Sequence, residues 1–378
     1  MRIGVLTFWH GTGNYGMMLQ CWALQRVLKR LGHDPYLIRY VAKIKKGLPR
    51  KILESVGLYR LFLRFVDSNK YNTLKEKEKH DALREFIRFR EENFKFSDRF
   101  YNSLEKLQKN PPTADCYITG SDQVWSKADL AYFLDFGNNE TKRISYAPSF
   151  GFTGYPDRLM PMLRHGLSRL DAISCREQSG VETCQRAGYN ATKVADPTML
   201  LDKEEYISLA SQGKPQTDSP YVFIYSLNLE KSRDIRFNEL KELCNKKCLN
   251  IVCTPGDGFS HGKEIYGEDA IYSYATIEQW LYNIANSALV ITPSFHGIVL
   301  SIILGKPFVY TPVKGARADS NDRINGLLHE LKLENQILTD DNSYERIAEH
   351  NIDWTAVNNA ISNLRKGSLE FLHNALLS

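Results

Sequence analysis

The sequence predicts an α/β protein in which each half forms a parallel β-sheet. In the first half, residues 3–9 read as a strand, 17–31 as a helix and 36–41 as a second strand. Such a β–α–β unit is typical of parallel sheets, because parallel strands need a crossover connection. In the second half, residues 285–312 give a short apolar strand, a loop, a buried helix and another strand. Both halves therefore indicate the same fold class.

The chain length favours two domains. Its 378 residues are enough for two domains of ordinary size. Residues 203–220 are polar, contain one glycine and two prolines, and so predict a linker region. We therefore expect domains at 1–199 and 200–378, with a cleft between them. Such interfaces are favoured places for small-molecule sites.

Composition excludes several classes of protein. The net charge of +5 is a mild excess and gives no nucleic-acid signature. The seven cysteines are odd in number and sparsely spaced, which predicts reduced thiols rather than a disulfide scaffold or a zinc site. Residues 1–9 lack the features of a signal peptide, and no apolar run approaches the ~20 residues of a membrane span. We expect a cytoplasmic protein that needs no cofactor or metal.

A glycine-rich loop, residues 10–16, follows the first strand. Its glycines fit G-x-G-x-x-G, but residues 38–41 lack the acid that a dinucleotide site requires. We expect instead a loop that approaches a ligand closely at Gly16, with Asn14 as a polar contact. A tight turn without a ligand is the alternative.

Residues 41–110 form a basic segment with helical spacing of apolar residues. They contain eighteen Lys and Arg against ten Asp and Glu. We predict a basic helical insertion in the first domain. Charge runs are usually solvated faces, and the alternative is a surface that meets anionic lipid or a diphosphate-linked acceptor.

Polar residues follow several predicted strands, at the edge where open α/β sheets bind ligands. After the strand 115–119, Ser121 and Trp125 are candidate sugar contacts and Asp122 is a candidate base. Arg176 follows the strand 172–175, where a guanidinium can hold a carboxylate or phosphate with two hydrogen bonds. The alternatives are a helix N-cap at residues 121–122 and a surface pairing of Arg176 with Glu177. Asp196 and Pro197 favour a turn out of the sheet.

The second half continues the α/β pattern up to its central loop. The predicted elements are strands at 221–226, 249–254, 288–291 and 308–311, with helices at 235–248, 277–288, 298–304 and near the carboxyl end. The loop before the third helix carries Ser294 and His296. A helix start offers unpaired N–H groups and partial positive charge to an anion, and histidine titrates near neutral pH. A serine N-cap beside a packed histidine is the alternative.

Together these motifs resemble the polysaccharide pyruvyl transferase family. The matching pieces follow the family order: Asn14-x-Gly16, Gly120–Trp125 (GSDQVW), Tyr146–Gly151 (YAPSFG), Ser174–Glu177 (SCRE), Asp196–Thr198 (DPT), Ser294–Gly297 (SFHG) and Gly305–Phe308 (GKPF). The resemblance implies two Rossmann-like domains facing a cleft, as in GT-B glycosyltransferases. It also implies transfer of pyruvate from phosphoenolpyruvate to a sugar of a bacterial surface polysaccharide, or of its undecaprenyl-diphosphate-linked precursor, as a cyclic ketal.

The resemblance also assigns roles to residues. His296 is expected to protonate the donor and Asp122 to activate the acceptor hydroxyl. Some family members have arginine where this chain has Ser294, so Arg176 carries more of the donor charge and Lys306, Arg317 and Arg323 are candidate replacements. The expected donor-binding set is Arg176, Ser294, Gly297, Asn14, Gly16, Lys306 and Arg323. A glycosyltransferase using a nucleotide sugar and a non-catalytic sugar- or lipid-carrier-binding subunit are the alternatives. We expect the enzyme to touch the inner membrane face at most peripherally.

Overall fold

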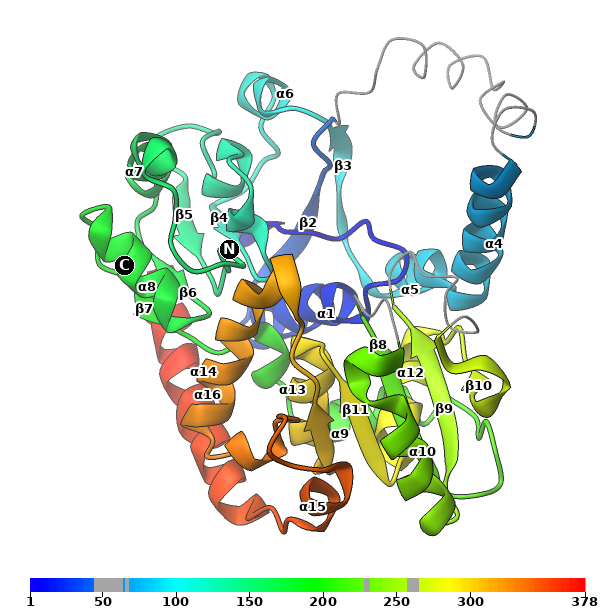
Figure 1. Cartoon of the computed structure of the whole chain (residues 1–378). Coiled ribbons are helices and arrows are strands. Elements are labelled where there is room, and N and C mark those ends of the chain that lie inside the picture. The colour runs from blue at the N-terminus through cyan, green and yellow to red at the C-terminus, as the bar shows by residue number, and fades with distance from the viewer. Residues whose placement is uncertain (44–63, 65–67, 228–231, 257–264, 378) are drawn as a thin grey trace.

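The first domain contains a five-stranded parallel sheet in the order β3-β2-β1-β4-β5. The computed structural model describes residues 1–43, 64, 68–227, 232–256 and 265–377 (Figure 1). A two-stranded parallel sheet, β6-β7, continues beyond β5 through a bridge between Ile144 and Ala172. The strands are β1 (Arg2–Leu6), β2 (Asp34–Tyr40), β3 (Phe96–Tyr101), β4 (Cys116–Thr119), β5 (Lys142–Ser145), β6 (Ser174–Cys175) and β7 (Thr192–Lys193).

Helices connect these strands. They are α1 (Tyr15–Arg30), α4 (Ser68–Arg84), α5 (Phe86–Asn93), α6 (Leu104–Lys109), α7 (Met160–Leu167) and α8 (Gln178–Arg186), with short 3-10 helices that include η1 (Val124–Ser126), η2 (Leu130–Phe133) and η4 (Pro197–Met199). α1 begins where the side chain of Asn14 accepts a hydrogen bond from the Met17 N–H.

The second domain repeats the strand order of the first. Its parallel sheet has the order β10-β9-β8-β11-β12. In both sheets the first strand of the domain is therefore central, with the second and third strands on one side of it and the fourth and fifth on the other. This order is that of a Rossmann-like sheet. The strands are β8 (Tyr221–Ser226), β9 (Asn250–Pro255), β10 (Ile271–Tyr272), β11 (Leu289–Thr292) and β12 (Phe308–Tyr310).

The helices of this half are α9 (Lys203–Ala210), α10 (Phe237–Lys246), α12 (Ile277–Asn286), α13 (Phe295–Leu304), α14 (Asp322–Glu330), α15 (Tyr344–Glu349) and α16 (Trp354–Leu377). α13 lies wholly in the interior. The Ser294 hydroxyl caps its start, and Gly305 ends it in the left-handed conformation with φ of 66°. The predicted buried helix of the central loop is therefore confirmed.

Two predictions about the organisation of the chain need correction. Residues 203–220 are not simply a linker, because they include α9, which packs on α12 and brings Tyr206 against Trp22 of α1. The segment 41–110 is not wholly an insertion, because residues 96–101 form β3 at the edge of the first sheet. Its residues 44–63 and 65–67 lie outside the described part of the chain.

A continuous apolar core joins the two domains. It contains Val5 of β1, Phe223 of β8 and Ile298 of α13, whereas Val222 and Ile224 of β8 point into a separate core on the outer face of the second sheet. Within the shared core, Tyr15 of α1 stacks on Trp280 of α12 with ring centroids 5.1 Å apart. A large apolar interface resists relative domain motion, so the residues between the domains lie in a fixed arrangement.

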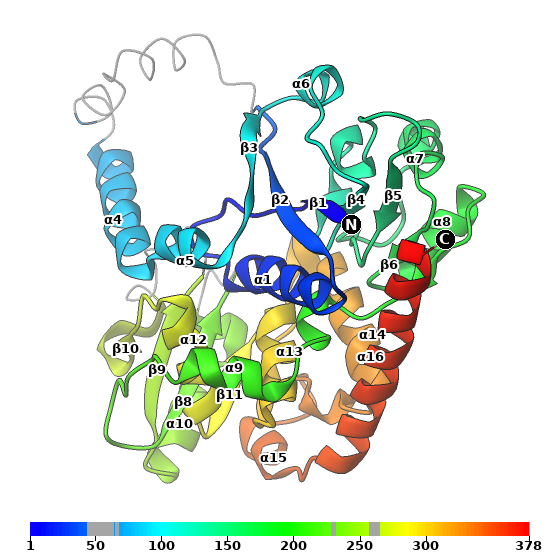
Figure 2. The same ribbon diagram turned by 180° about the vertical axis from the view of Figure 1, so that it is seen from behind.

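The chain end adds a second connection. α16 starts in the second domain and runs along one side of the molecule to the first, where the carboxyl end lies beside α8 and β6 (Figures 1 and 2). The hydroxyl of Ser368 accepts a hydrogen bond of 2.8 Å from the Ala195 N–H, and Arg365 donates to the carbonyls of Met199 and Leu201. α16 therefore holds the segment that follows β7. Within the described ranges, none of the helices has the length and apolar character to span a membrane.

Candidate active site

The buried carboxylate of Asp196 lies at the junction of the two domains. Its Oδ2 accepts hydrogen bonds from the Ser121 hydroxyl at 2.8 Å and from Arg176 Nη1 at 3.0 Å, and it lies 3.5 Å from His296 Nε2. Its Oδ1 accepts from the N–H and the hydroxyl of Thr198 at 3.0 and 2.7 Å. Asp196 thus connects three loops of the first domain to α13 of the second.

Burial alone would raise the pKa of Asp196. The charges of His296 and Arg176 and the hydrogen bonds from Thr198 outweigh burial and hold this pKa well below its ordinary value. The carboxyl group is therefore ionised at any working pH, and a buried charge of this kind needs its partners.

His296 is fixed by contacts on both sides of its ring. The residue is 6% exposed, and Nε2 has no hydrogen-bond partner in the described part of the chain beyond its ion-pair contact with Asp196. A Cβ placed on Gly16 of α1 would lie 2.0 Å from His296 Nδ1. The glycine at position 16 is therefore needed so that the imidazole can pack against the first turn of α1.

Arg176 has unused hydrogen-bonding capacity in a buried position. Its side chain is 2% exposed, and its guanidinium lies over the ring of Phe295 at 4.5 Å. Nη1 donates to Asp196, whereas Nε and Nη2 have no hydrogen-bond partner in the described residues, and Glu177 approaches Nε only to 3.8 Å. Unsatisfied buried donors are rare in proteins and call for a ligand or water.

Arg323 of α14 brings a second guanidinium to the same ring. It lies 5.8 Å from the centroid of Phe295, and its Nε is also buried without a partner in the described residues. Burial, followed by repulsion from Arg176, lowers the pKa of Arg323 to about 10, with Asp122 and Glu177 acting in the opposite direction. Two guanidinium groups held this close without full neutralisation favour the binding of an anion.

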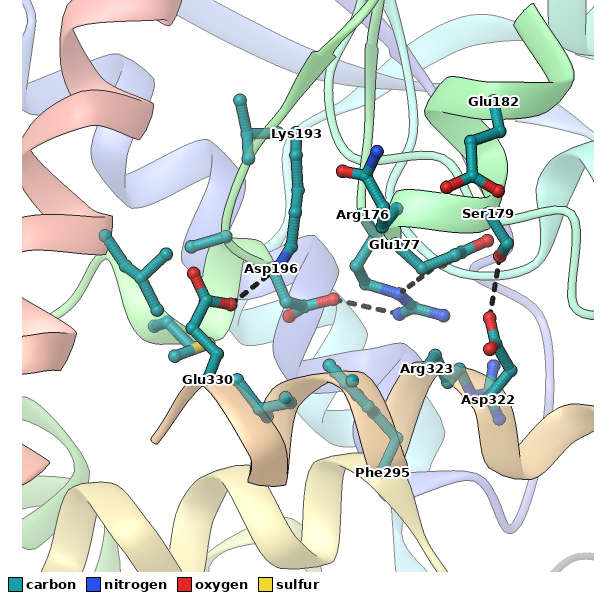
Figure 3. A pocket seen from close by; sticks show the side chains of 17 residues that line it. Arg176, Glu177, Ser179, Glu182, Lys193, Asp196, Phe295, Asp322, Arg323 and Glu330 are labelled. Carbon is teal, nitrogen blue, oxygen red and sulfur yellow. Dashed lines mark hydrogen bonds and ion pairs between the residues drawn. The ribbon is translucent and has the colours of Figure 1, made fainter. Parts of the chain in front are cut away.

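A cavity of about 210 Å³ lies between the domains beside these residues (Figure 3). Arg176, Asp196, Phe295 and Arg323 line it, and Leu364 of α16 closes one wall. Two hydrogen bonds at the edge of this cavity join the two domains. Ser179 Oγ donates to Asp322 at 2.7 Å, and Lys193 Nζ donates to Glu330 at 2.6 Å. His296 is not among the residues that line this cavity, but it lies 3.5 Å from Asp196, which does line it.

The lining includes five carboxylates against three cationic side chains, so the cavity as a whole is not cationic. These groups are Glu177, Glu182, Asp196, Asp322 and Glu330, and Arg176, Lys193 and Arg323. Lys193 and one edge of Arg176 are already paired. Any preference for an anion must therefore come from the unpaired nitrogens of Arg176 and Arg323.

Several predicted ligand contacts are wrong because the side chains are buried or distant. Trp125 is fully buried, stacks on Phe133 at 4.9 Å and donates from Nε1 to the Tyr132 carbonyl, so it offers no face to a sugar. Ser121 is also fully buried and donates to Asp196 and the Ala147 carbonyl.

Lys306 is likewise misplaced. It follows the carboxyl end of α13, whose ten residues span ~15 Å, whereas His296 lies in the first turn. The side chain of Arg317 lies outside the part that the structure describes. Of the candidate replacements for the arginine that is absent at Ser294, the structure brings Arg323 to the site.

The predicted helix-start donors are largely occupied. Ser294 Oγ accepts from the Gly297 N–H at 3.3 Å, and the Ser294 carbonyl accepts from the Ile298 N–H at 3.0 Å. The expectation that amides following His296 would face the donor is therefore wrong. Ser294 and Asn14 act as N-caps in this structure.

Asp122 remains close to the charged cluster. It is 9% exposed, has a left-handed φ of 66°, and accepts a hydrogen bond of 2.8 Å from the Gln123 N–H through Oδ1. Its charge acts on Arg323. The Gln123 amide, oriented with its oxygen toward Arg323, also accepts from that guanidinium.

Asp196 is the residue whose importance the sequence analysis missed. The sequence analysis interprets it as the start of a turn out of the sheet and as part of the DPT motif, and gives its side chain no role in the site. Its position three residues after β7, near Ser121 and Arg176, was the available signal. The partner from the second domain, His296, follows in sequence only after 100 further residues.

The fold and the site together define a two-domain protein of the GT-B-like class, with a charged site between its Rossmann-like domains. A family model described as Polysaccharide pyruvyl transferase matches residues 14–314, which is most of the chain. The chain belongs to this family. The resemblance and the fold predicted from the sequence are both confirmed, and the family makes the protein a transferase of polysaccharide pyruvylation.

Solved structures with a similar fold include UDP-N-acetylglucosamine 2-epimerases. The enzyme from Rickettsia bellii is 10% identical, with a TM-score of 0.51 over 99% of this chain and 96% of its own. The enzyme from Methanocaldococcus jannaschii, in complex with UDP-GlcNAc and UDP, is 12% identical, with a TM-score of 0.50 over 100% of both chains. At this identity the similarity shows the fold alone. Among curated proteins, no significant sequence match was found.

Replacing Gly16 tests whether the packing of His296 matters. In Gly16→Ala the new methyl group would overlap the imidazole, so the ring must shift away from α1. A displacement of about 1 Å can cost about 10²-fold in rate, and we expect a loss of that order in pyruvyl transfer. The measurement is turnover with the folded variant.

Gly367→Ala is the matched control, because it lies in α16 with open space around the added methyl group. We expect it to raise the free energy of unfolding by roughly 0.5–1 kcal/mol and to leave activity unchanged. Full activity in Gly16→Ala would show that the position of His296 is not critical.

Proposed function

We propose that this protein transfers pyruvate from phosphoenolpyruvate to a sugar of a surface polysaccharide or of its lipid-linked precursor, forming a cyclic ketal. The observation that carries the proposal is the buried guanidinium of Arg176, with two nitrogens that have no hydrogen-bond partner in the described residues. It lies beside Arg323 and shares the Asp196 carboxylate with His296.

Phosphoenolpyruvate carries a carboxylate and a phosphate, and the two guanidinium groups match these two anionic ends. Arg176 presents Nε and Nη2, the edge of a guanidinium that can donate two parallel hydrogen bonds to one carboxylate or phosphate. Arg323 supplies a second positive charge from the other domain. Burial and then repulsion from Arg176 lower the pKa of Arg323 in the free protein, and binding the donor would relieve the repulsion.

The reaction then proceeds by proton transfer and two additions at one carbon. His296 gives a proton to C3 of the donor, which becomes a methyl group, while C2 gains cationic character. A sugar hydroxyl adds to C2 and its proton passes to Asp122. The C2–O bond to phosphate breaks, inorganic phosphate leaves, and a second hydroxyl adds to C2 with loss of its proton. The products are the ketal and phosphate.

Substitution of His296 tests the proposed acid. His296→Gln keeps a polar side chain of similar size but cannot supply the proton, and a general acid is typically worth ~10²–10⁴ in rate. We expect phosphate release from phosphoenolpyruvate, measured with a panel of lipid-linked sugars, to fall by that factor. His329→Ala is the control, because its side chain is 85% exposed. Near-normal release in His296→Gln would remove His296 from the chemistry.

The alternative donor, a nucleotide sugar, is distinguished by binding. We expect phosphoenolpyruvate, but not UDP or GDP sugars, to raise the melting temperature of the wild-type protein. In Arg176→Lys the bidentate edge is lost, and hydrogen bonds to charged groups contribute about 1.5–3 kcal/mol, so affinity should fall roughly 10- to 150-fold.

Arg186→Lys is the matched control, because Arg186 is half exposed and pairs only with the exposed Asp157 among the described residues. Stabilisation by nucleotide sugars alone would favour a glycosyltransferase. An absence of binding by either class of donor would favour a non-catalytic subunit.

We also propose that the basic segment 41–110 contacts the membrane or the diphosphate of a lipid-linked acceptor. Its support is the excess of eighteen Lys and Arg over ten Asp and Glu. Deletion of residues 45–75 removes much of this charge and leaves β3 intact. We expect weaker binding to vesicles that contain anionic lipid, measured by co-sedimentation, and equal binding would contradict the proposal.

A further inference from the structure

Asp196 sets the orientation of two groups that the proposed reaction uses. Its Oδ2 contacts Nη1 of Arg176 at 3.0 Å and lies 3.5 Å from Nε2 of His296. Asp196 accepts a hydrogen bond only from Nη1 of Arg176, so Nε and Nη2 of this guanidinium can donate to a ligand. A carboxylate placed against a different nitrogen would block the bidentate edge that the donor requires.

The carboxylate itself is held in place from the other side. Thr198 donates its N–H and its hydroxyl to Oδ1, and Ser121 donates to Oδ2. All three residues are fully buried, so no water competes for these bonds at the protein surface. Asp196 therefore has a fixed position before any ligand binds, which is what an orienting group needs.

We propose that Asp196 is a positioning residue that fixes the orientation of the His296 ring and leaves the donor-binding edge of Arg176 free. The inference rests on the proposed function, since it concerns the acid and the anion-binding arginine of that reaction. It adds a residue for which neither the family match nor the sequence motif gives a role. It also explains why the two groups, which come from different domains, meet at one carboxylate.

Several other charged and titratable groups surround this pair in the described part of the chain. Arg323 of α14 and Asp122 after β4 act on the cluster with opposite signs, and Glu177 lies 3.8 Å from Arg176 Nε. Cys21 of α1 feels Asp122 and Asp196, but burial raises its pKa well above the ordinary value, so it stays a neutral thiol. Among the described residues, Asp196 is the carboxylate that lies within ion-pair distance of His296.

The test is Asp196→Asn, which keeps the size of the side chain and removes the charge. If Asp196 orients the acid and the arginine, kcat/KM for phosphoenolpyruvate falls by about 10²–10⁴. The KM for phosphoenolpyruvate rises as the edge of Arg176 turns. The imidazole resonances of His296, followed by NMR of histidine-labelled protein and assigned with His296→Gln, move as the ring loses its contact with the carboxylate. A kcat/KM and His296 resonances equal to those of the wild type would overturn the inference.

Thr198→Val is the matched control. It removes the hydroxyl that donates to Oδ1 but leaves the charge of Asp196 and its contacts with Arg176 and His296. We expect lower thermal stability, with His296 resonances and a KM for phosphoenolpyruvate close to those of the wild type. A purely structural Asp196 would make the two variants alike, with lost stability and no movement of the His296 resonances, and that outcome would also overturn the inference.

If Asp196→Asn does not fold, Asp196→Glu serves in its place. It keeps the charge but moves it by one methylene, so we expect a raised KM for phosphoenolpyruvate as Arg176 turns. Unchanged kcat and KM would contradict the positioning role. Failure of the proposed function gives a different result: the wild type would release no phosphate from phosphoenolpyruvate, while NMR would still decide whether Asp196 controls His296.

Discussion

The buried carboxylate of Asp196 imposes a constraint that much of the interdomain structure satisfies. An ionised group with no exposed surface is stable only if its partners stay in place, and two of those partners, Arg176 and His296, come from different domains. The shared apolar core and α16 hold the domains together. A rigid junction of this kind would suit the proposed reaction, in which His296 and Arg176 have to keep a fixed relation.

The sequence predicts the interior helices and strands well, because the apolar pattern and the capping residues of each lie within its own stretch of sequence. The strand 221–226 and the helix starting at Ile277 agree with β8 and α12, whose apolar pattern and capping residues are local. The strand β3 was missed because buried and exposed residues do not alternate regularly along it: Asp98, Arg99 and Phe100 are all exposed at the sheet edge. α9 was missed because its polar residues suggest a linker, while Tyr206 and Ala210 face the core.

The sequence singles out side chains at the ends of strands, but not the contacts that they make with residues distant in sequence. Arg176 and His296 each follow a strand, and the structure brings both to the Asp196 carboxylate. Trp125 was misassigned since nothing local to it reveals that Phe133 and Tyr132 enclose its ring. Asp196 was undervalued because a turn signal describes the backbone and not the partners that the fold brings to the side chain. Pairing across domains is the information that a single sequence lacks.

Under the proposed function, Arg323 would supply the positive charge that the resemblance places, in some family members, on an arginine at the position of Ser294. Charge at a site must be near the ligand, but the element that supplies it is free to change. Here α14 delivers a guanidinium to the ring of Phe295, one residue after Ser294. That ring already lies beneath Arg176, and its π face tolerates two cations that would otherwise only repel. The UDP-N-acetylglucosamine 2-epimerases share the fold at about 10% identity. The proposed donor is therefore supported by the placement of charge around Asp196 and not by the fold.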